Sequence, residues 1–218
     1  MHSTSYSKRK ASGMCQFSLI PGTISKDNMS ETIPTPGQKE SKKEQWLAEL
    51  TKFLSESYQH GWAAGAEKAK DPETGEKTLI YERGEWKSID RYTGYFAAPG
   101  ETKIFYKGRH AWSMQYGGEG QRPKYYREVQ QTYAFLKEAL QAFNPELPVR
   151  GPEYYRGEDG EWQYSFTVEG DIENGIWREK IDKWTGYPGE AELFFSQNGT
   201  CGIIIDKDAD HNPVYPWD

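Results

Sequence analysis

The sequence predicts an α+β protein made of two tandem helix-plus-antiparallel-sheet units with an aromatic-rich sheet, preceded by a disordered N-terminal leader. Three observations predict it: many aromatic side chains, helical and strand-like patterns that alternate in two rounds, and a short motif that recurs. The 218-residue chain has 8 Trp, 15 Tyr and 9 Phe. Each buried aromatic ring removes on the order of 150 Å² from water, so these rings are sufficient to build a core.

Residues 1–42 are predicted to be a disordered leader, because they are rich in Ser, Thr, Pro, Gly and Lys and show no periodicity. Met29 begins a string, MSETIPTPG, that is typical of a protein start, which leaves open whether residues 1–28 are part of the natural protein. The short apolar run at 14–20 is interrupted by Gln16 and Ser18, so it is no signal-peptide core. We therefore expect a cytoplasmic protein.

The body of the chain, residues 43–206, is predicted to be a single α+β domain of two pseudo-repeats, at about 43–118 and 124–206. Apolar side chains at three- and four-residue spacing predict the first helix, which ends near Gly61. These are Trp46, Leu47, Leu50, Phe53 and Leu54. Strand-like runs follow at 78–83, 85–92, 101–107 and 110–116.

The second unit repeats this order. A helix is predicted over about 125–143, because Tyr126, Val129, Tyr133, Leu136 and Leu140 share one stripe and Asn144-Pro145 ends it. Five strand-like runs follow, at 153–157, 161–170, 175–184, 191–197 and 201–207. Residues 207–218 are predicted to be a polar tail.

Short sequence matches support an internal repeat. IDRYTGY at 89–95 recurs as IDKWTGY at 181–187, and each copy is followed by a similar strand, GETKIFY and GEAELFF. In this motif Gly supplies a turn conformation, and Tyr95 or Tyr187 is expected to begin the next strand as a packing anchor. Such tandem helix–sheet repeats resemble proteinaceous inhibitors of β-lactamases, which is an analogy of fold alone.

The charge is unevenly distributed. The chain carries 27 basic and 33 acidic residues, a net charge of −6. Residues 1–45 hold seven basic and four acidic residues, a net of +3, which leaves −9 for the remainder. An acidic body binds phosphate backbones poorly, so a nucleic-acid partner is not expected. No membrane partner is expected either.

Few residues suggest chemistry. The four histidines (2, 60, 110 and 211) are far apart in the sequence, so no metal site is predicted, and no known nucleotide or cofactor motif is present. His110 is the best lone candidate for proton transfer. A small hydrolase or transferase that uses His110 with a nearby carboxylate such as Glu119 is therefore one alternative function.

The candidate site lies on the predicted strand 110–116. Trp112, Met114 and Tyr116 alternate on one face, and a Gly-rich loop follows. Such a face suits either a core or a ligand platform. With Arg91 and Tyr95, which the repeat would place nearby, it predicts a non-enzymatic cytosolic binding or sensing module for an unknown protein or small molecule. An antitoxin- or immunity-type inhibitor with an acidic surface is a second alternative.

A longer pattern is similar to a known family. The string YTGYF…GETKIFYKGRHAWSMQYGG, followed by RGPEYY, resembles an uncharacterised bacterial family that occurs alone or as the C-terminal part of some XRE-type transcriptional regulators. The matching positions are Tyr92, Gly94, Phe96, Gly100, Trp112, Met114, Tyr116, Gly117, Arg150, Gly151 and Pro152. Gln115 stands where the family usually has Asn. The resemblance covers about residues 46–206 and implies no established activity.

Overall fold

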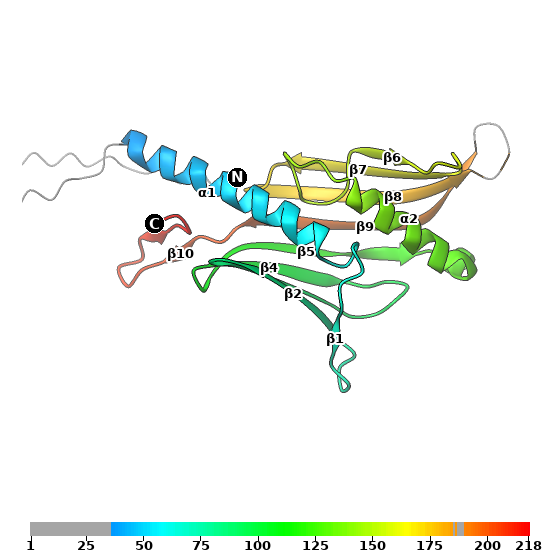
Figure 1. Cartoon of the computed structure of the whole chain (residues 1–218), viewed down its shortest axis with the longest axis horizontal. Coiled ribbons are helices and arrows are strands. Elements are labelled where there is room, and N and C mark those ends of the chain that lie inside the picture. The colour runs from blue at the N-terminus through cyan, green and yellow to red at the C-terminus, as the bar shows by residue number, and fades with distance from the viewer. Residues whose placement is uncertain (1–35, 185, 187–189) are drawn as a thin grey trace, which may run out of the picture. The chain divides into compact units, whose positions relative to one another are not determined.

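A nine-stranded antiparallel sheet dominates the fold (Figure 1). The structure is a computed structural model that describes residues 36–184, 186 and 190–218. The strands lie side by side in the order β1-β2-β3-β4-β5-β9-β8-β7-β6. Their bounds are β1 Ala69–Lys70, β2 Lys77–Arg83, β3 Trp86–Tyr92, β4 Gly100–Tyr106, β5 Arg109–Gln121, β6 Tyr154–Arg156, β7 Trp162–Gly170, β8 Asn174–Trp184 and β9 Ala191–Ile203. The mixed α+β class that the sequence predicts is confirmed.

The first helix starts earlier than the sequence pattern indicates. Helix α1 spans Pro36–Gln59, whereas the predicted leader runs to residue 42. Proline is well accommodated in the first turn of a helix, and the Gln, Lys and Glu residues that follow are good helix formers. Because these residues are polar, they carry no apolar periodicity that would reveal a helix. The rest of the predicted leader, residues 1–35, lies outside the described residues.

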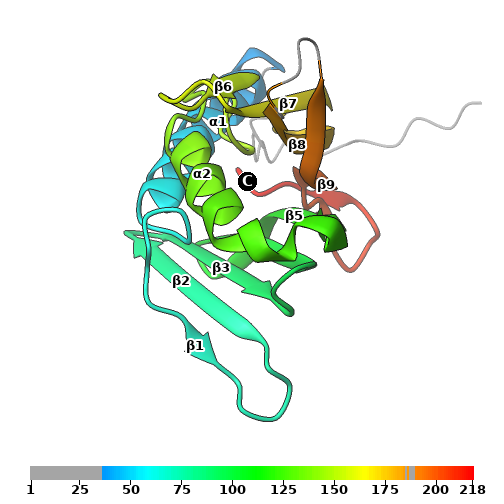
Figure 2. The same cartoon turned by 90° about the vertical axis from the view of Figure 1, so that its right-hand side faces the viewer.

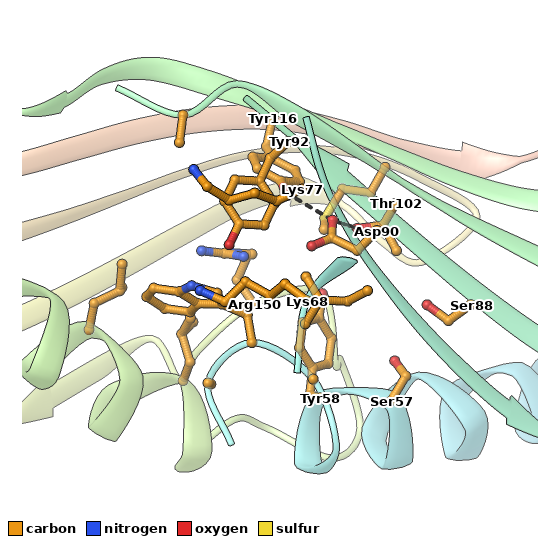
Figure 3. Close-up of a pocket in the computed structure, with 18 of the residues that line it drawn as sticks. Ser57, Tyr58, Lys68, Lys77, Ser88, Asp90, Tyr92, Thr102, Tyr116 and Arg150 are labelled. Atoms are coloured by element: carbon orange, nitrogen blue, oxygen red, sulfur yellow. Dashed lines mark hydrogen bonds between the residues drawn. The ribbon is translucent and has the colours of Figure 1, made fainter. Parts of the chain in front are cut away.

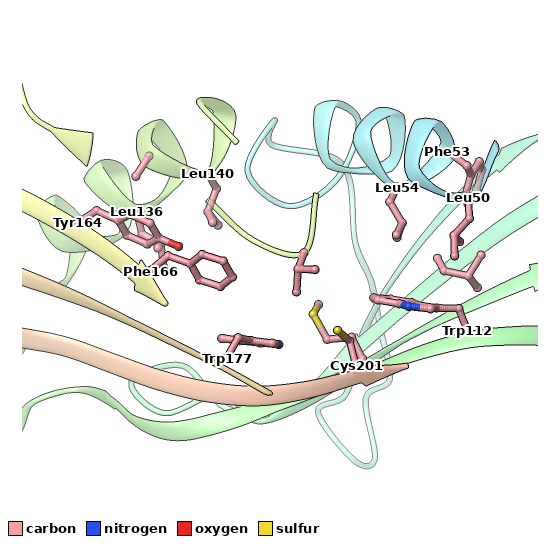
Figure 4. Packing of buried hydrophobic residues seen from close by; sticks show 14 of the residues in the cluster. Leu50, Phe53, Leu54, Trp112, Leu136, Leu140, Tyr164, Phe166, Trp177 and Cys201 are labelled. Atoms are coloured by element: carbon pink, nitrogen blue, oxygen red, sulfur yellow. The ribbon is translucent and has the colours of Figure 1, made fainter. Parts of the chain in front are cut away.

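Both long helices cover the same face of the sheet, which curls around them (Figure 2). Helix α2 spans Val129–Gln141 and follows the short 3-10 helix η1, Pro123–Glu128. The helices bury one stripe each, including Phe53 and Leu54 of α1 and Leu136 of α2. These side chains meet the rings of Trp112 and Trp177 from the sheet (Figure 4). The aromatic face of the sheet is therefore the covered, core face.

Each half of the chain contains a helix followed by an antiparallel meander. Helix α1 precedes the meander β2 to β5, helix α2 precedes the meander β6 to β9, and the halves join where β5 pairs antiparallel with β9. However, the repeated strings lie on strands that this order does not make equivalent. IDRY ends β3, the second strand of its meander, and IDKW ends β8, the third of its own. Tyr187 lies outside the described residues, and the duplication stays a prediction.

The predicted Gly-rich loop is the end of a long strand. Strand β5 continues through Gly117 and Gly120 to Gln121, with an irregular register against β9 at these glycines. The backbone N–H of Gln121 donates a hydrogen bond to the Phe96 carbonyl at 2.7 Å. A Cβ on Gly120, whose φ is +65°, would lie 2.1 Å from that oxygen. Glycine here permits a close approach of the 94–98 segment, which local pattern reasoning does not reveal.

The C-terminal region also differs from its prediction. The two strands expected at 191–197 and 201–207 are one strand, β9, which ends at Ile203. A hairpin of β10, Asp206–Lys207, and β11, Pro213–Val214, begins at the end of the predicted body and occupies most of the predicted polar tail. The Trp217 ring of this tail packs 5.5 Å from that of Trp46 on α1. The C-terminal segment therefore packs against α1 through an aromatic ring, although its composition is polar.

Among the described residues, no helix combines the length and the apolar character needed to cross a bilayer.

Candidate ligand-binding pocket

A pocket of about 290 Å³ lies between the helices and the sheet, beside the core (Figure 3). The end of α1 and the turn after it line one side, and α2 lines another. Strands β2 to β5 and β9 provide the remaining wall. At this point the side chains of α1, α2 and the sheet do not fill the whole space between the helices and the strands.

Asp90 is the one carboxylate among the described residues that line this pocket. It lies on the core face of β3, which it shares with Trp86, Ser88 and Tyr92. Its Oδ1 accepts hydrogen bonds from the Thr102 and Tyr116 hydroxyls, both at 2.9 Å. Burial raises the pKa of Asp90, although both hydrogen bonds and the nearby Arg150 charge oppose the rise.

Arg150, in the segment after α2, also lines the pocket. Its positive charge is neutralised by Glu179 of β8. Arg150 Nε donates to Glu179 Oε2 at 3.1 Å, and Nη2 donates to Oε1 at 2.6 Å. Glu179 also accepts from the Tyr164 hydroxyl at 2.8 Å. Burial alone lowers the pKa of the guanidinium, but the Glu179 carboxylate more than offsets this and raises it overall. This pair is a neutral unit within the core.

Two tyrosines present polar ends at the pocket. The Tyr58 hydroxyl, from α1, donates to the Val149 carbonyl, and burial raises the pKa of Tyr58. Tyr92 is half-buried, and burial together with the neighbouring Asp90 raises its pKa to about 12. Both phenols are therefore neutral hydrogen-bonding groups at physiological pH.

The rest of the wall is apolar. Leu79 of β2, Met114 of β5 and Leu140 of α2 are buried core residues that also line the pocket. Leu136 and Phe195 extend this surface. An apolar surface that faces an open cavity has no packing partner, and so it favours a ligand with an apolar body.

The exposed rim combines lysines with aromatic rings. Lys68, before β1, and Lys77, at the start of β2, both line the pocket. The Lys77 ammonium lies 5.0 Å from the Tyr92 ring centre and donates to the Gly94 carbonyl. Tyr95, which is 52% exposed, contacts the Tyr133 ring edge-on at 5.7 Å.

The structure separates the predicted site residues into three groups. Met114, Tyr116 and Tyr95 line the pocket. Trp112 is fully buried, and its indole N–H donates to the Ile172 carbonyl at 2.7 Å, so it belongs to the core rather than to the pocket. Arg91 alternates with Asp90 on β3 and points away from the pocket; its side chain is 57% exposed and lies 3.8 Å from Glu76.

The motif predicts that Tyr95 begins the next strand, and this prediction is wrong. Tyr95 lies in the loop between β3 and β4, because β4 starts only at Gly100. The preceding Gly94 does adopt the turn conformation expected of it, with a φ of +96°.

The alternative catalytic pair is not brought together. His110 and Glu119 lie nine residues apart on the same strand, β5, which is roughly 30 Å in an extended chain. The His110 ring stacks on Phe105 at 5.3 Å, and Glu119 accepts from Arg122 at 2.9 Å. Neither residue lines the pocket. Among the described residues, no group of three His, Cys, Asp or Glu side chains could hold a metal ion.

Several pocket residues were not predicted from the sequence. Asp90 does carry a signal, because it is an acidic residue on the same face of β3 as the aromatic residues Trp86 and Tyr92. Arg150 stands in the RGP string, but nothing in the sequence pairs it with Glu179. Lys68, Lys77 and Tyr58 come from separate elements, so only the tertiary fold brings them together.

The fold and the pocket together define an α+β protein with a small-molecule-sized cavity between two helices and an antiparallel sheet. Residues 90–190 match the model of a domain of unknown function, DUF5680. This match includes Asp90, Tyr92, Tyr116 and Arg150 but not α1. No curated protein and no solved structure matches the chain.

Proposed function

We propose that this protein is a non-enzymatic small-molecule-binding module whose site is the pocket between α1, α2 and the sheet. The observation that carries the proposal is an apolar cavity with one carboxylate among its described lining residues, which is hydrogen-bonded and faces the space. Ligand sites are commonly concave, mostly apolar and equipped with a few polar groups that fix orientation. At about 290 Å³, this pocket is near the lower end of the usual range and fits a small ligand.

Binding is favoured over catalysis because the strongest polar groups are already engaged. Arg150 is neutralised by Glu179, and Asp90 Oδ1 accepts two hydroxyl hydrogens. Both arrangements hold side chains in place and leave these groups fewer free lone pairs and protons for chemistry. A cytoplasmic sensing role agrees with the proposal, because the sequence resembles domains that are attached to XRE-type regulators in bacteria.

The inhibitor alternative has less support. On the face of the sheet that α1 and α2 leave open, acidic side chains form ion pairs with basic ones. Examples are Lys103 with Glu101 at 2.9 Å and Lys180 with Asp182 at 2.8 Å. This mixture of both signs gives a basic partner little net attraction.

A matched pair of variants tests the proposal. Ala63 lines the pocket and Ala64, the next residue in the same turn, does not. We expect Ala63→Trp to fill the entrance and Ala64→Trp to leave it open. A thermal-shift screen of small molecules should therefore give compounds that stabilise the wild type and Ala64→Trp but not Ala63→Trp. If no compound shows this dependence, the pocket is not a binding site.

A further inference from the structure

We infer that the ligand of this pocket is a small apolar acid, whose carboxylate binds between Lys68 and Lys77 and whose apolar body reaches toward Met114 and Leu140. The inference rests on the proposed function and adds the chemical class of the ligand. It is drawn from the positive charges of Lys68 and Lys77 at the rim, which have no carboxylate partner among the described residues.

Lysines gather at the rim without carboxylates. Within the described part of the chain, neither Lys68 nor Lys77 has an ion-pair partner, and neither does Lys137, whose ammonium lies 5.0 Å from the Trp62 ring centre. Lys68 is exposed but partly desolvated, which lowers its pKa, and the positive charges of Lys137 and Lys77 lower it further. The Lys137 and Lys77 charges therefore repel that of Lys68, and an anion bound beside Lys68 and Lys77 at the rim relieves part of this repulsion.

The lysines retain free donors for such an anion. The Lys77 ammonium donates one hydrogen bond, to the Gly94 carbonyl, and has three N–H groups in all. No hydrogen bond from the Lys68 ammonium is made within the described residues. A carboxylate can accept from both side chains through its two oxygens, which is the stronger, charge-assisted kind of hydrogen bond.

The charged groups inside the pocket, Arg150 and Asp90, do not draw an anion away from the rim and attract a cation only weakly. Glu179 neutralises Arg150, so this guanidinium does not draw the acidic group inward. Asp90 Oδ1 already accepts two hydroxyl hydrogens, which reduces its attraction for an ammonium ligand. An amphipathic acid therefore matches the pocket best when its charge stays at the rim and its apolar part enters.

The orientation follows from where the apolar side chains lie. Met114 and Leu140 are almost fully buried and face the cavity, whereas Lys68 is exposed. Transfer of an apolar ring or short chain from water onto these side chains stabilises the complex without removing the carboxylate from water.

A series of three ligands that differ only in the head group tests the charge. We propose calorimetric titration of the full chain at neutral pH with 3-phenylpropanoate, 3-phenylpropan-1-ol and 3-phenylpropylammonium. The anion should bind roughly tenfold more tightly than the alcohol, and the ammonium should bind most weakly. The double variant Lys68→Gln/Lys77→Gln should remove most of the preference for the anion and leave the affinity for the alcohol unchanged. Lys103→Gln, on the open face of the sheet, is the control and should change nothing.

The outcomes separate this inference from the proposed function. Equal or tighter binding of the alcohol or the ammonium, with binding still blocked by Ala63→Trp, overturns the acid and keeps the pocket. If none of the three binds, the charge of the compounds found in the Ala63-dependent screen decides: neutral or cationic compounds overturn the inference, and anionic ones support it. An absence of any Ala63-dependent compound overturns the proposed function itself.

Discussion

Arg150 and Glu179 form a buried, two-pronged ion pair that joins the segment after α2 to strand β8. The two hydrogen bonds measure 3.1 and 2.6 Å, and the Glu179 side chain is completely buried. The guanidinium also lies 5.4 Å from the Trp177 ring centre and 5.9 Å from that of Tyr116. One side chain therefore connects the core to the pocket wall.

Removal of one partner of this pair should destabilise the fold strongly. Arg150→Met leaves the Glu179 carboxylate buried without its cation, which typically costs about 3–5 kcal/mol. The double variant Arg150→Met/Glu179→Met should cost less than the single one. Urea unfolding measures both, with Arg91→Met as the exposed control, expected to cost less than about 1 kcal/mol. Equal losses for Arg150→Met and Arg91→Met would contradict the structural role of the pair.

Asp90 should make stability fall as the pH rises. Its pKa in the folded chain lies above the ordinary value of 3.8, so the folded state binds the proton more readily than the unfolded state. The stabilisation is complete below pH 3.8 and is lost as the pH rises through the folded-state pKa.

Asp90→Asn keeps the Oδ1 acceptor for Thr102 and Tyr116 without the charge. The free energy of unfolding of Asp90→Asn minus that of the wild type should therefore increase from acid to neutral pH. Because Arg150 and Tyr116 are present in both proteins, the difference between the two free energies of unfolding reports the charge of Asp90. A difference that does not change with pH would show that the Asp90 pKa is not raised.

Trp112 should act as a core residue. Trp112→Ala removes a fully buried ring and its hydrogen bond to Ile172, a change that typically costs about 3–5 kcal/mol. Ile176→Ala, at a position that is 56% exposed, is the surface control and should change stability by less than about 0.5 kcal/mol. Thermal or urea unfolding of both variants checks this. A Trp112→Ala variant as stable as the control would place the ring at the surface.

Gly94 should be intolerant of any side chain. Its φ is +96°, and a Cβ would lie 2.2 Å from the Ala97 carbonyl oxygen, so Gly94→Ala should cost about 1–3 kcal/mol and disturb the pocket rim. Gly84, with a φ of +59° and open space around it, separates the effect of the clash from that of the conformation. Circular dichroism melts should show a greater loss for Gly94→Ala than for Gly84→Ala. The reverse order would contradict the close approach at Ala97.

Local patterns predicted most elements of this fold. The apolar spacing of Leu50, Phe53 and Leu54 identified α1, and the alternation in WKSIDRY identified β3, because each periodicity reports one buried face. The start of α1 at Pro36 and the extension of β5 to Gln121 were missed. In both segments the structure depends on polar helix formers or on glycine contacts rather than on an apolar stripe.

The candidate site was predicted only in part, for a geometric reason. Trp112, Met114 and Tyr116 lie on one face of β5, but the sequence does not say where the helices cover that face. The helices cover Trp112 and leave Met114 and Tyr116 beside the pocket. The lysines and Asp90 come from other elements, so their proximity is a property of the tertiary fold alone.

The methyl group of Met114 provides the most direct measurement of ligand binding in the pocket. The chain has four methionines, and Met114 is the one that lies within residues 36–218. With ¹³C-methyl-methionine labelling, titration with 3-phenylpropanoate or a compound from the Ala63-dependent screen should shift the Met114 resonance. Ala63→Trp should abolish the shift of the Met114 signal. A compound that binds with measurable heat yet leaves the Met114 resonance in place would contradict binding in this pocket.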